Sequence, residues 1–277
     1  MIRKTFLFLL LFSYHFIVQA QSNDRLETEK TKKEIASNWF AETGGVYSDF
    51  QDIKFSDVRY SGIGAVLNLG YNRTKTDMYY MEAALSFLYS KENAHTHNNG
   101  GTTVLYSTIY FKYLRQLNEH FLLGARVDIF DLNMRIGLNL QNNSAQYLAS
   151  NNLYAALIYK RPINDRWKFS GSIDLAMIGM QKDMPSFAMN YNQKRIEDGE
   201  IDYQDINLGE PYPYHYWEFS HIFNSLNLKT AINFHYKSRI SLSYNWEMRR
   251  WATIKSYPST IGVHNIVFRY NFVHKSK

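Results

Sequence analysis

The chain has 277 residues, of which 16% are aromatic, with 22 Tyr, 18 Phe, no Cys and a formal net charge of +6. The lack of Cys excludes a disulfide scaffold, a thiolate metal site and a thiol nucleophile. The charge is modest and the basic residues are scattered, so we expect no nucleic-acid partner. Many aromatic residues together with a negative mean hydropathy are typical of transmembrane β-barrels, in which apolar and polar residues alternate. A soluble β domain is the competing interpretation.

The N-terminus has the pattern of a secretory signal peptide. Arg3 and Lys4 supply the positive charge, residues 5–18 are an apolar run, and Val18-Gln19-Ala20 is a small-x-small cleavage site. The run is shorter than the roughly 18 to 20 residues of a spanning helix, although an uncleaved anchor is the alternative. The predicted organisation is a signal peptide at 1–20, a polar periplasmic lead at 21–37 and a single barrel domain at 38–273.

Period-2 alternation dominates the chain after the lead and predicts half-buried strands. It is clearest at 240–248, where apolar residues from Ile240 to Met248 alternate with Ser241, Ser243 and other polar residues. Most segments are long enough for the 9 to 11 residues that a tilted strand needs to cross the hydrocarbon. The ten predicted strands are 38–48, 59–72, 77–90, 103–114, 120–131, 146–160, 167–180, 216–236, 239–251 and 261–273.

The predicted connections alternate in length, which favours an exported barrel over a soluble sandwich. Barrels with both termini in the periplasm have short periplasmic turns and long outer loops. We therefore predict an all-β, antiparallel, up-and-down transmembrane barrel of ten strands, or of twelve if 181–215 contains a hairpin. The short connections are 73–76, 114–119, 161–166 and 237–238, and the long ones are 49–58, 91–102, 132–145, 181–215 and 252–260.

The chain resembles the outer-membrane β-barrel proteins of Gram-negative bacteria, particularly the small Tyr-rich ones of the Bacteroidota type. The signal peptide, the repeated alternating strands and the aromatic end from Ile266 to Phe272 (IVFRYNF) carry this resemblance. The end departs from the usual pattern because five residues follow Phe272. The resemblance implies an integral outer-membrane location, lipid as the surroundings and the barrel-assembly machinery as a partner during insertion. It implies no particular activity.

Charged residues on the polar face of the strands should point into the lumen, where opposite charges must pair. We expect Lys229 to pair with Asp174 and Glu247, which lie at one depth on successive strands. We interpret the whole set as a structural ion-pair network, with a charged constriction as the alternative. The predicted network consists of Glu82, Lys112, Arg126, Asp128, Asp174, Lys229, Glu247 and Arg269.

The sequence leaves three functions open. We favour a structural or surface-interaction role with a side-chain-filled lumen, ahead of a narrow solute or ion channel. A lipid hydrolase at the barrel rim is third, because Ser220 adjoins His221 but the flanking residues match no such active site. We expect no metal and no cofactor, since His95 and His97 lie in an Asn- and Gly-rich loop. The long loop 181–215 is the candidate surface for a partner.

The first prediction concerns export. Mass spectrometry of membrane fractions should find a mature chain that begins at Gln21, because the small residues before the cleavage point fit signal peptidase. The mature chain should co-sediment with outer-membrane markers and migrate faster on gels when unboiled. A soluble periplasmic product would contradict both the signal and the barrel prediction.

Overall fold

The structure is a computed structural model that describes residues 35–52, 56–75, 78–95, 101–137, 145–185, 217–237, 239–251 and 259–274. The predicted signal peptide and nearly all of the predicted lead lie outside the described residues. Two compact units are distinguished along the chain, and the described residues all belong to the second, Ile35–Lys277.

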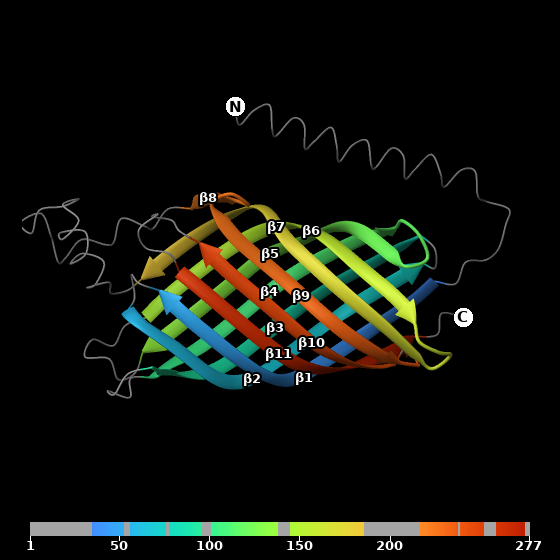
Figure 1. Cartoon of the computed structure of the whole chain (residues 1–277), viewed down its shortest axis with the longest axis horizontal. Coiled ribbons are helices and arrows are strands. Elements are labelled where there is room, and N and C mark those ends of the chain that lie inside the picture. The colour runs from blue at the N-terminus through green and yellow to red at the C-terminus, as the bar shows by residue number, and fades with distance from the viewer. Residues whose placement is uncertain are drawn as a thin grey trace, which may run out of the picture. The chain divides into compact units, whose positions relative to one another are not determined.

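The described chain forms one antiparallel sheet that closes on itself as a barrel (Figure 1). Consecutive strands pair from β1 to β7, β11 pairs with β1, and β7 pairs with β9, so the ring has no free edge. The strands are β1 (Ile35–Asp52), β2 (Ser56–Lys75), β3 (Tyr79–Ala94), β4 (Gly101–Gln116), β5 (Phe121–Gly137), β6 (Ala145–Pro162), β7 (Trp167–Pro185), β8 (Glu218–His221), β9 (Ser225–Tyr236), β10 (Ile240–Trp251) and β11 (Ser259–His274).

Ten long strands make up the ring, which confirms the predicted fold class and strand number. The predicted strand 216–236 is interrupted, however, by a turn between His221 and Ser225, and its two parts β8 and β9 pair in succession with β7. Asn224 holds the turn, because its side-chain oxygen accepts from the backbone N–H of His221 at 2.7 Å. The twelve-strand alternative is wrong, since β7 pairs directly with β9.

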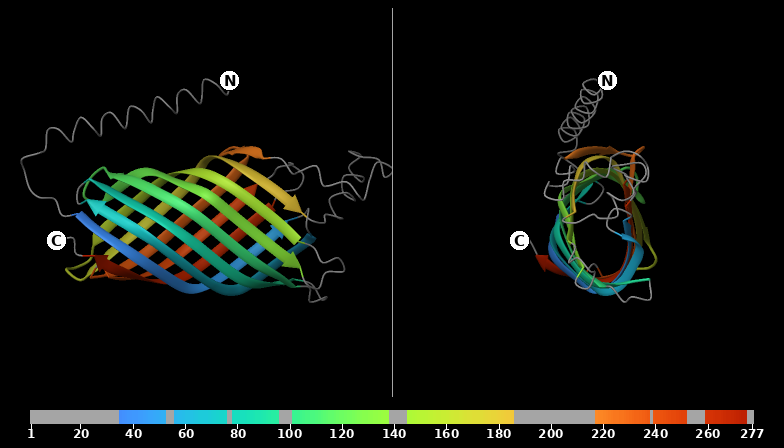
Figure 2. Two further views of the ribbon diagram at one scale, coloured as in Figure 1. Left: turned by 180° about the vertical axis from the view of Figure 1, so that it is seen from behind. Right: turned by 90° about the vertical axis from the view of Figure 1, so that its left-hand side faces the viewer.

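The stagger of the strands fixes the width of the barrel. One continuous ladder of paired residues leaves β1 at Ile35, passes once through every long strand and returns to β1 at Tyr47, twelve residues further along. Such a shear forces the strands to tilt, typically by about 35 to 45°, and Figure 2 shows this tilt from the side and the closed ring from one end. Ten strands enclose an interior only slightly wider than one that side chains can fill.

The short turns at one end of the barrel are built by local sequence. In the β5 turn, Asn118 Oδ1 accepts from the backbone N–H groups of His120 and Phe121, both at 2.9 Å. In the β7 turn, Asn164 Oδ1 accepts from Arg166 and Trp167 in the same way. An Asn side chain that mimics a backbone turn in this manner favours a tight reversal.

The connections at the other end are shorter than predicted, because the strands extend further. β1 and β2 are joined by residues 53–55 in place of the predicted loop 49–58, and β5 runs to Gly137 in place of 131. The backbone ladder continues beyond the region in which apolar and polar residues alternate, so periodicity alone underestimates the strands. The predicted loop 181–215 begins as strand to Pro185, and residues 186–215 lie outside the described residues.

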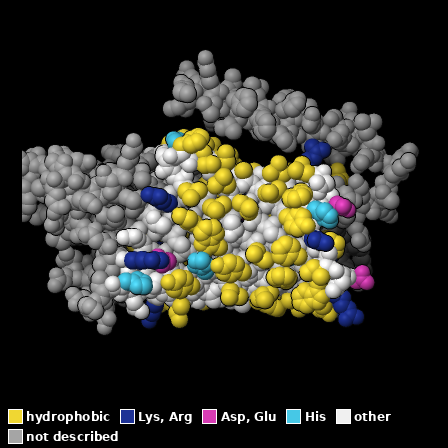
Figure 3. All heavy atoms as spheres, in the orientation of Figure 1, with side chains coloured by type: hydrophobic (Ala, Val, Ile, Leu, Met, Phe, Trp, Pro, Cys, Tyr) yellow, Lys and Arg dark blue, Asp and Glu magenta, His cyan; other side chains and the backbone are white. Residues whose placement is uncertain are grey.

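The two faces of the sheet differ as the alternation predicts. In β3, Phe87 and Tyr89 are 46% and 43% exposed on the outside, whereas Leu88 and Ser90 between and beside them are buried on the inside. Figure 3 shows hydrophobic side chains over the middle of the visible face, with Lys, Arg, Asp and Glu toward its two ends. An apolar exterior around a closed ladder is the arrangement that lets strands cross a membrane with no unpaired backbone group.

No helix among the described residues has both the length and the apolar character to cross a membrane.

The second prediction tests the apolar exterior. Leu67→Arg, at mid-belt on β2, should lower the free energy of unfolding by about 2 to 4 kcal/mol, because a charge there lies in hydrocarbon. Ile63→Arg lies four residues further toward the loop end on the same face of β2 and should cost only about 0 to 1 kcal/mol. Chemical denaturation in lipid measures both, and equal costs would contradict the placement of the belt.

Candidate functional site: the lumen network

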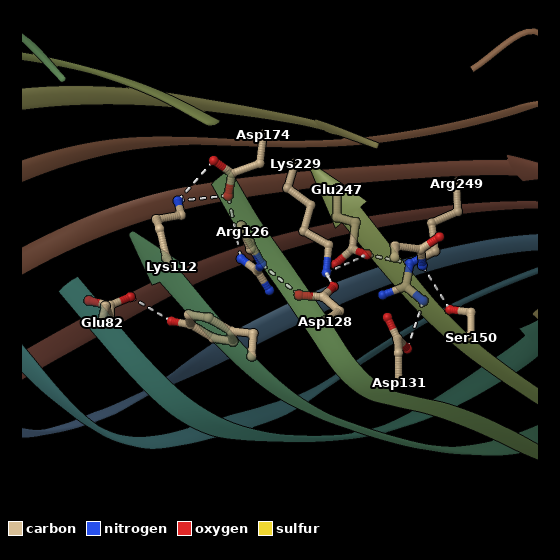
Figure 4. A network of polar contacts seen from close by, with 12 residues as sticks. Glu82, Lys112, Arg126, Asp128, Asp131, Ser150, Asp174, Lys229, Glu247 and Arg249 are labelled. Carbon is tan, nitrogen blue, oxygen red and sulfur yellow. Dashed lines mark hydrogen bonds and ion pairs between the residues drawn. The ribbon is translucent and has the colours of Figure 1, made fainter. Parts of the chain in front are cut away.

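Charged side chains from five strands, β4, β5, β7, β9 and β10, meet in the middle of the lumen (Figure 4). Asp128 is fully buried and accepts from Arg126 Nε and Lys229 Nζ, each at 2.7 Å. Lys112 donates to Asp174, which also lies 3.5 Å from Arg126. We name this group, which has four basic and four acidic members and is therefore neutral, the Asp128 cluster; it consists of Lys112, Arg126, Asp128, Asp131, Asp174, Lys229, Glu247 and Arg249.

Several of its ion pairs join strands that are not neighbours in the sheet. Lys112 on β4 reaches Asp174 on β7 at 2.7 Å, and Lys229 on β9 reaches Asp128 on β5. Arg249 on β10 donates to Asp131 on β5 at 2.8 Å and also contacts Tyr106 on β4 and Glu247. These contacts cross the lumen, so they tie opposite walls together in addition to the backbone ladder.

A second group lies nearer the short turns and centres on Glu82. Its carboxylate accepts from Arg269 at 2.9 Å and from the Tyr110 hydroxyl at 2.6 Å, and also from Tyr80. Arg269 pairs in addition with Glu42 on the adjoining strand β1. The Tyr80 and Tyr110 hydroxyls and the Arg269 guanidinium thus supply the hydrogen-bond donors that the buried Glu82 carboxylate requires.

Apolar side chains fill the lumen on either side of the charges. The larger cluster lies toward the loop end, and the smaller one, Leu114, Leu122 and Ala156, lies toward the short turns. Within the loop half, the Arg135 guanidinium stacks 3.6 Å from the Phe50 ring and lies 3.5 Å from Glu92. The larger cluster consists of Val46, Phe50, Tyr60, Val66, Leu88, Tyr106, Leu148, Ile261, Val263 and Val267.

Two small cavities lie among these layers. A cavity of about 10 Å³ lies beside Tyr106, Glu247 and Arg249, and another of about 20 Å³ lies beside Asn152 and Asn227. A water molecule needs at least about 10 to 15 Å³ of such space. Each cavity therefore has room for about one water molecule and not for a continuous column.

The eight residues predicted for the network all point into the lumen and all make ion pairs there. The partners differ in one case. Lys229 lies 3.5 Å from Glu247 as expected, but the predicted pairing with Asp174 is wrong. Asp174 is in register with Lys229, yet its carboxylate binds Lys112, and Lys229 binds Asp128 across the lumen.

A β-bulge explains why the alternation missed Asp131. Continuing the alternation from Asp128 places residue 131 on the outside. Ile129 and Phe130 instead both face outward, at 58% and 45% exposure, and the register shifts between Asp128 and Asp131. The bulge turns Asp131 inward to meet Arg249. The signal in the sequence is two consecutive apolar residues followed by an acid that would otherwise face lipid.

Other lumen residues were also absent from the predicted network. Glu42, Glu92 and Arg135 are buried and ion-paired, but they lie outside the segments that display clean alternation. The apolar core of the loop half was likewise not anticipated. Apolar residues at inward-facing positions, such as Val46, Phe50 and Val66, indicate this core in the sequence. We did not use them because we expected a polar lumen.

The geometry at Ser220 and His221 does not form a nucleophile and base. Ser220 is buried on the lumen side, and His221 Nδ1 accepts from the backbone N–H of Phe223 at 3.2 Å. Neighbouring residues of a strand point to opposite faces, so the two side chains diverge. His95 contacts the Ser61 hydroxyl at 2.7 Å, and His97 lies outside the described residues. Among the described residues, no three His, Asp or Glu side chains gather as metal ligands would.

Comparison with known proteins gives structural likeness alone. No family model and no curated protein matches the sequence. The outer membrane protease OmpT of Escherichia coli is similar over 89% of this chain and 99% of its own, with 7% identity and a TM-score of 0.48. The attachment invasion locus protein Ail of Yersinia pestis covers 85% and 99%, with 8% identity and a TM-score of 0.32. The outer membrane protein OprG of Pseudomonas aeruginosa covers 88% and 99%, with 10% identity and a TM-score of 0.30.

Such low identities and TM-scores decide nothing about the function of this protein. Its placement in the outer membrane rests on the features of the barrel itself. Single-chain outer-membrane barrels have an even number of tilted antiparallel strands, an apolar outer band with aromatic girdles, and a polar interior. The ten antiparallel strands, the apolar outer belt and the charged lumen described above meet the criteria of strand number, outer band and polar interior. The chain is an integral outer-membrane β-barrel, surrounded by lipid.

The third prediction concerns the Asp128 cluster. Lys229→Leu should lower the free energy of unfolding by about 3 to 5 kcal/mol, because Asp128 loses a 2.7 Å partner in a closed interior. Ile232→Val, on the outer face of the same strand, should cost no more than about 0.5 to 1.5 kcal/mol. A urea titration compares the two variants. Equal or reversed costs would show that the lumen pairing contributes nothing to stability.

Proposed function

We propose that the protein is a closed, non-conducting outer-membrane barrel with a structural or surface-interaction role, in which the Asp128 cluster acts as a permanent cross-brace and plug. The lumen then serves to hold the barrel rigid, and any interaction with a partner takes place outside it. The contact that carries this proposal is the pair from Lys229 on β9 to Asp128 on β5, which spans the lumen at its middle.

Three features support closure over conduction. The Asp128 cluster is neutral, so it offers no excess of one sign to select ions, whereas selective constrictions use rings of one charge. Arg126 and Lys229 both lie against the Tyr154 ring, at 5.7 and 5.3 Å, which packs the cations in place. Apolar side chains above and below exclude the water that a pore would need.

The alternatives receive less support. A narrow channel requires the cross-lumen pairs to break, and breaking a buried pair costs about 3 to 5 kcal/mol. A hydrolase at the rim requires Ser220 and His221 to converge, and they face opposite sides of the wall. The partner surface in 181–215 and the contact with the assembly machinery stay predictions, because most of that loop lies outside the described residues.

The fourth prediction tests the plug. Wild-type protein in planar bilayers should show little or no steady conductance. Lys229→Ala combined with Arg126→Ala should raise the conductance, because it removes two long side chains from mid-lumen and frees Asp128 from both of its basic partners.

A matched control removes two basic side chains from the outside. Lys91→Ala combined with Arg73→Ala should leave the conductance at the wild-type level, since both residues are exposed on the outer face. Faster migration of the unboiled sample on gels verifies that each variant is folded. Large and stable conductance of the wild-type barrel would overturn the proposal in favour of a channel.

A further inference from the structure

An aromatic cluster on the lipid-facing wall contains a histidine. His264 on β11 lies on one rung of the sheet between Trp246 on β10 and Tyr47 on β1. Its ring centroid is 6.1 Å from that of Tyr47 and 6.5 Å from that of Trp246. The Tyr244 hydroxyl lies 2.7 Å from His264 Nδ1, a hydrogen bond. None of these side chains takes part in the lumen network, because all four point outward.

The cluster lies at the boundary between the charged rim and the apolar belt. Asp49 on β1 lies two residues nearer the loop end than Tyr47, on the same outer face, and forms an ion pair with Arg59. In the opposite direction, toward the apolar belt, the next outward-facing residues are Gly45 on β1 and Ile266 on β11, and Ile266 is 61% exposed. His264 is therefore placed where lipid headgroups give way to acyl chains, the level at which aromatic belts lie.

The Tyr244–His264 pair carries one more donor than it uses. A neutral imidazole and a phenol together have two polar hydrogens, and their mutual hydrogen bond takes one of them. Either the Nε2–H of His264 or the hydroxyl hydrogen of Tyr244 is left, whichever way the bond runs. Among the described residues, no second hydrogen bond or ion pair of either side chain is found. A donor at the edge of the hydrocarbon is costly if it has no acceptor.

The surroundings offer a hydrogen-bond acceptor at this depth. The barrel is enclosed by lipid, and the groups between a lipid's headgroup and its chains are acyl carbonyl oxygens, which accept hydrogen bonds and donate none. A Cβ at Gly45 would meet no atom within 4 Å, so the wall beside Tyr47 is low and an acyl chain can lie against it. The aromatic rings of Tyr47 and Trp246 supply apolar contact on either side.

We propose that Tyr244 and His264 form a site that binds the acyl carbonyl of one membrane lipid. The site would hold that lipid against β10, β11 and β1 at the outer end of the belt, in contrast to the lipids that exchange freely elsewhere. It involves a different face of the barrel from the plug, so either proposal can fail without the other.

The test compares an ester lipid with its ether analogue. Barrel in nanodiscs of diacyl phosphatidylethanolamine, transferred to detergent, should retain one more lipid molecule by native mass spectrometry than the His264→Phe variant does. In nanodiscs of the dialkyl-ether phosphatidylethanolamine, which lacks the carbonyl oxygens, wild type should fall to the level of the variant. His264→Gln keeps an amide donor and should retain part of the difference.

His221→Phe is the matched control, because it makes the same substitution at an outward-facing position of β8 against β7, away from β10, β11 and β1. Its lipid retention should equal that of wild type. Equal retention of ester and ether lipids by wild type would overturn the site, and so would an unchanged His264→Phe. A dimer that His264→Phe abolishes would instead assign the cluster to a second copy of the chain. If His264→Phe does not fold, the ester and ether comparison on wild type still decides.

Discussion

Closure of the backbone ladder is the constraint from which the rest of this molecule follows. In hydrocarbon every N–H and C=O needs a partner within the protein, and the pairing of β11 with β1 provides the last set. A closed ring of ten strands with this stagger has a fixed and narrow interior. Whatever side chains the sequence places on the inner face must therefore fit together in that space.

The side chains of the lumen fit together in layers. Most of the charges lie between the two apolar clusters, which shield these ion pairs from water, while the Arg135–Glu92 pair lies within the loop half. Shielding strengthens each pair and also raises the cost of leaving one unmade. The equal numbers of acids and bases in the Asp128 cluster follow from the same reasoning, because an unpaired charge at this position could not be solvated by water.

The outer face obeys a different rule, since lipid offers only acyl carbonyls and headgroups as polar partners. On the face that Figure 3 shows, charged side chains gather toward the two ends of the belt, where the headgroups lie. Tyr244 and His264 are placed at that boundary, and their mutual hydrogen bond satisfies all but one of their donors. The same sheet therefore buries ion pairs on one side and sorts its polar groups by depth on the other.

The sequence by itself determined the class of fold, the number of long strands and the face on which each predicted charge lies. It could do so because period-2 alternation is a local property, and each strand displays it independently of its neighbours. Glu82 and Lys229, for example, are assigned to the inside by the residues on either side of them. The sequence predicted less well how far the strands extend at the loop end, because the alternation ends where the membrane ends.

Only the tertiary structure decided which charged side chains of the lumen form ion pairs with each other. Lys229 binds Asp128 across the lumen, while Asp174, its neighbour in register, binds Lys112. Those distances depend on the stagger of the closed ring, which no single strand encodes. The inward turn of Asp131 depends on a bulge between β5 and β6, and a bulge shifts the face of every residue beyond it. The partners in this lumen are therefore set by the shape of the ring, because side chains a hundred residues apart in the chain meet only once it has closed.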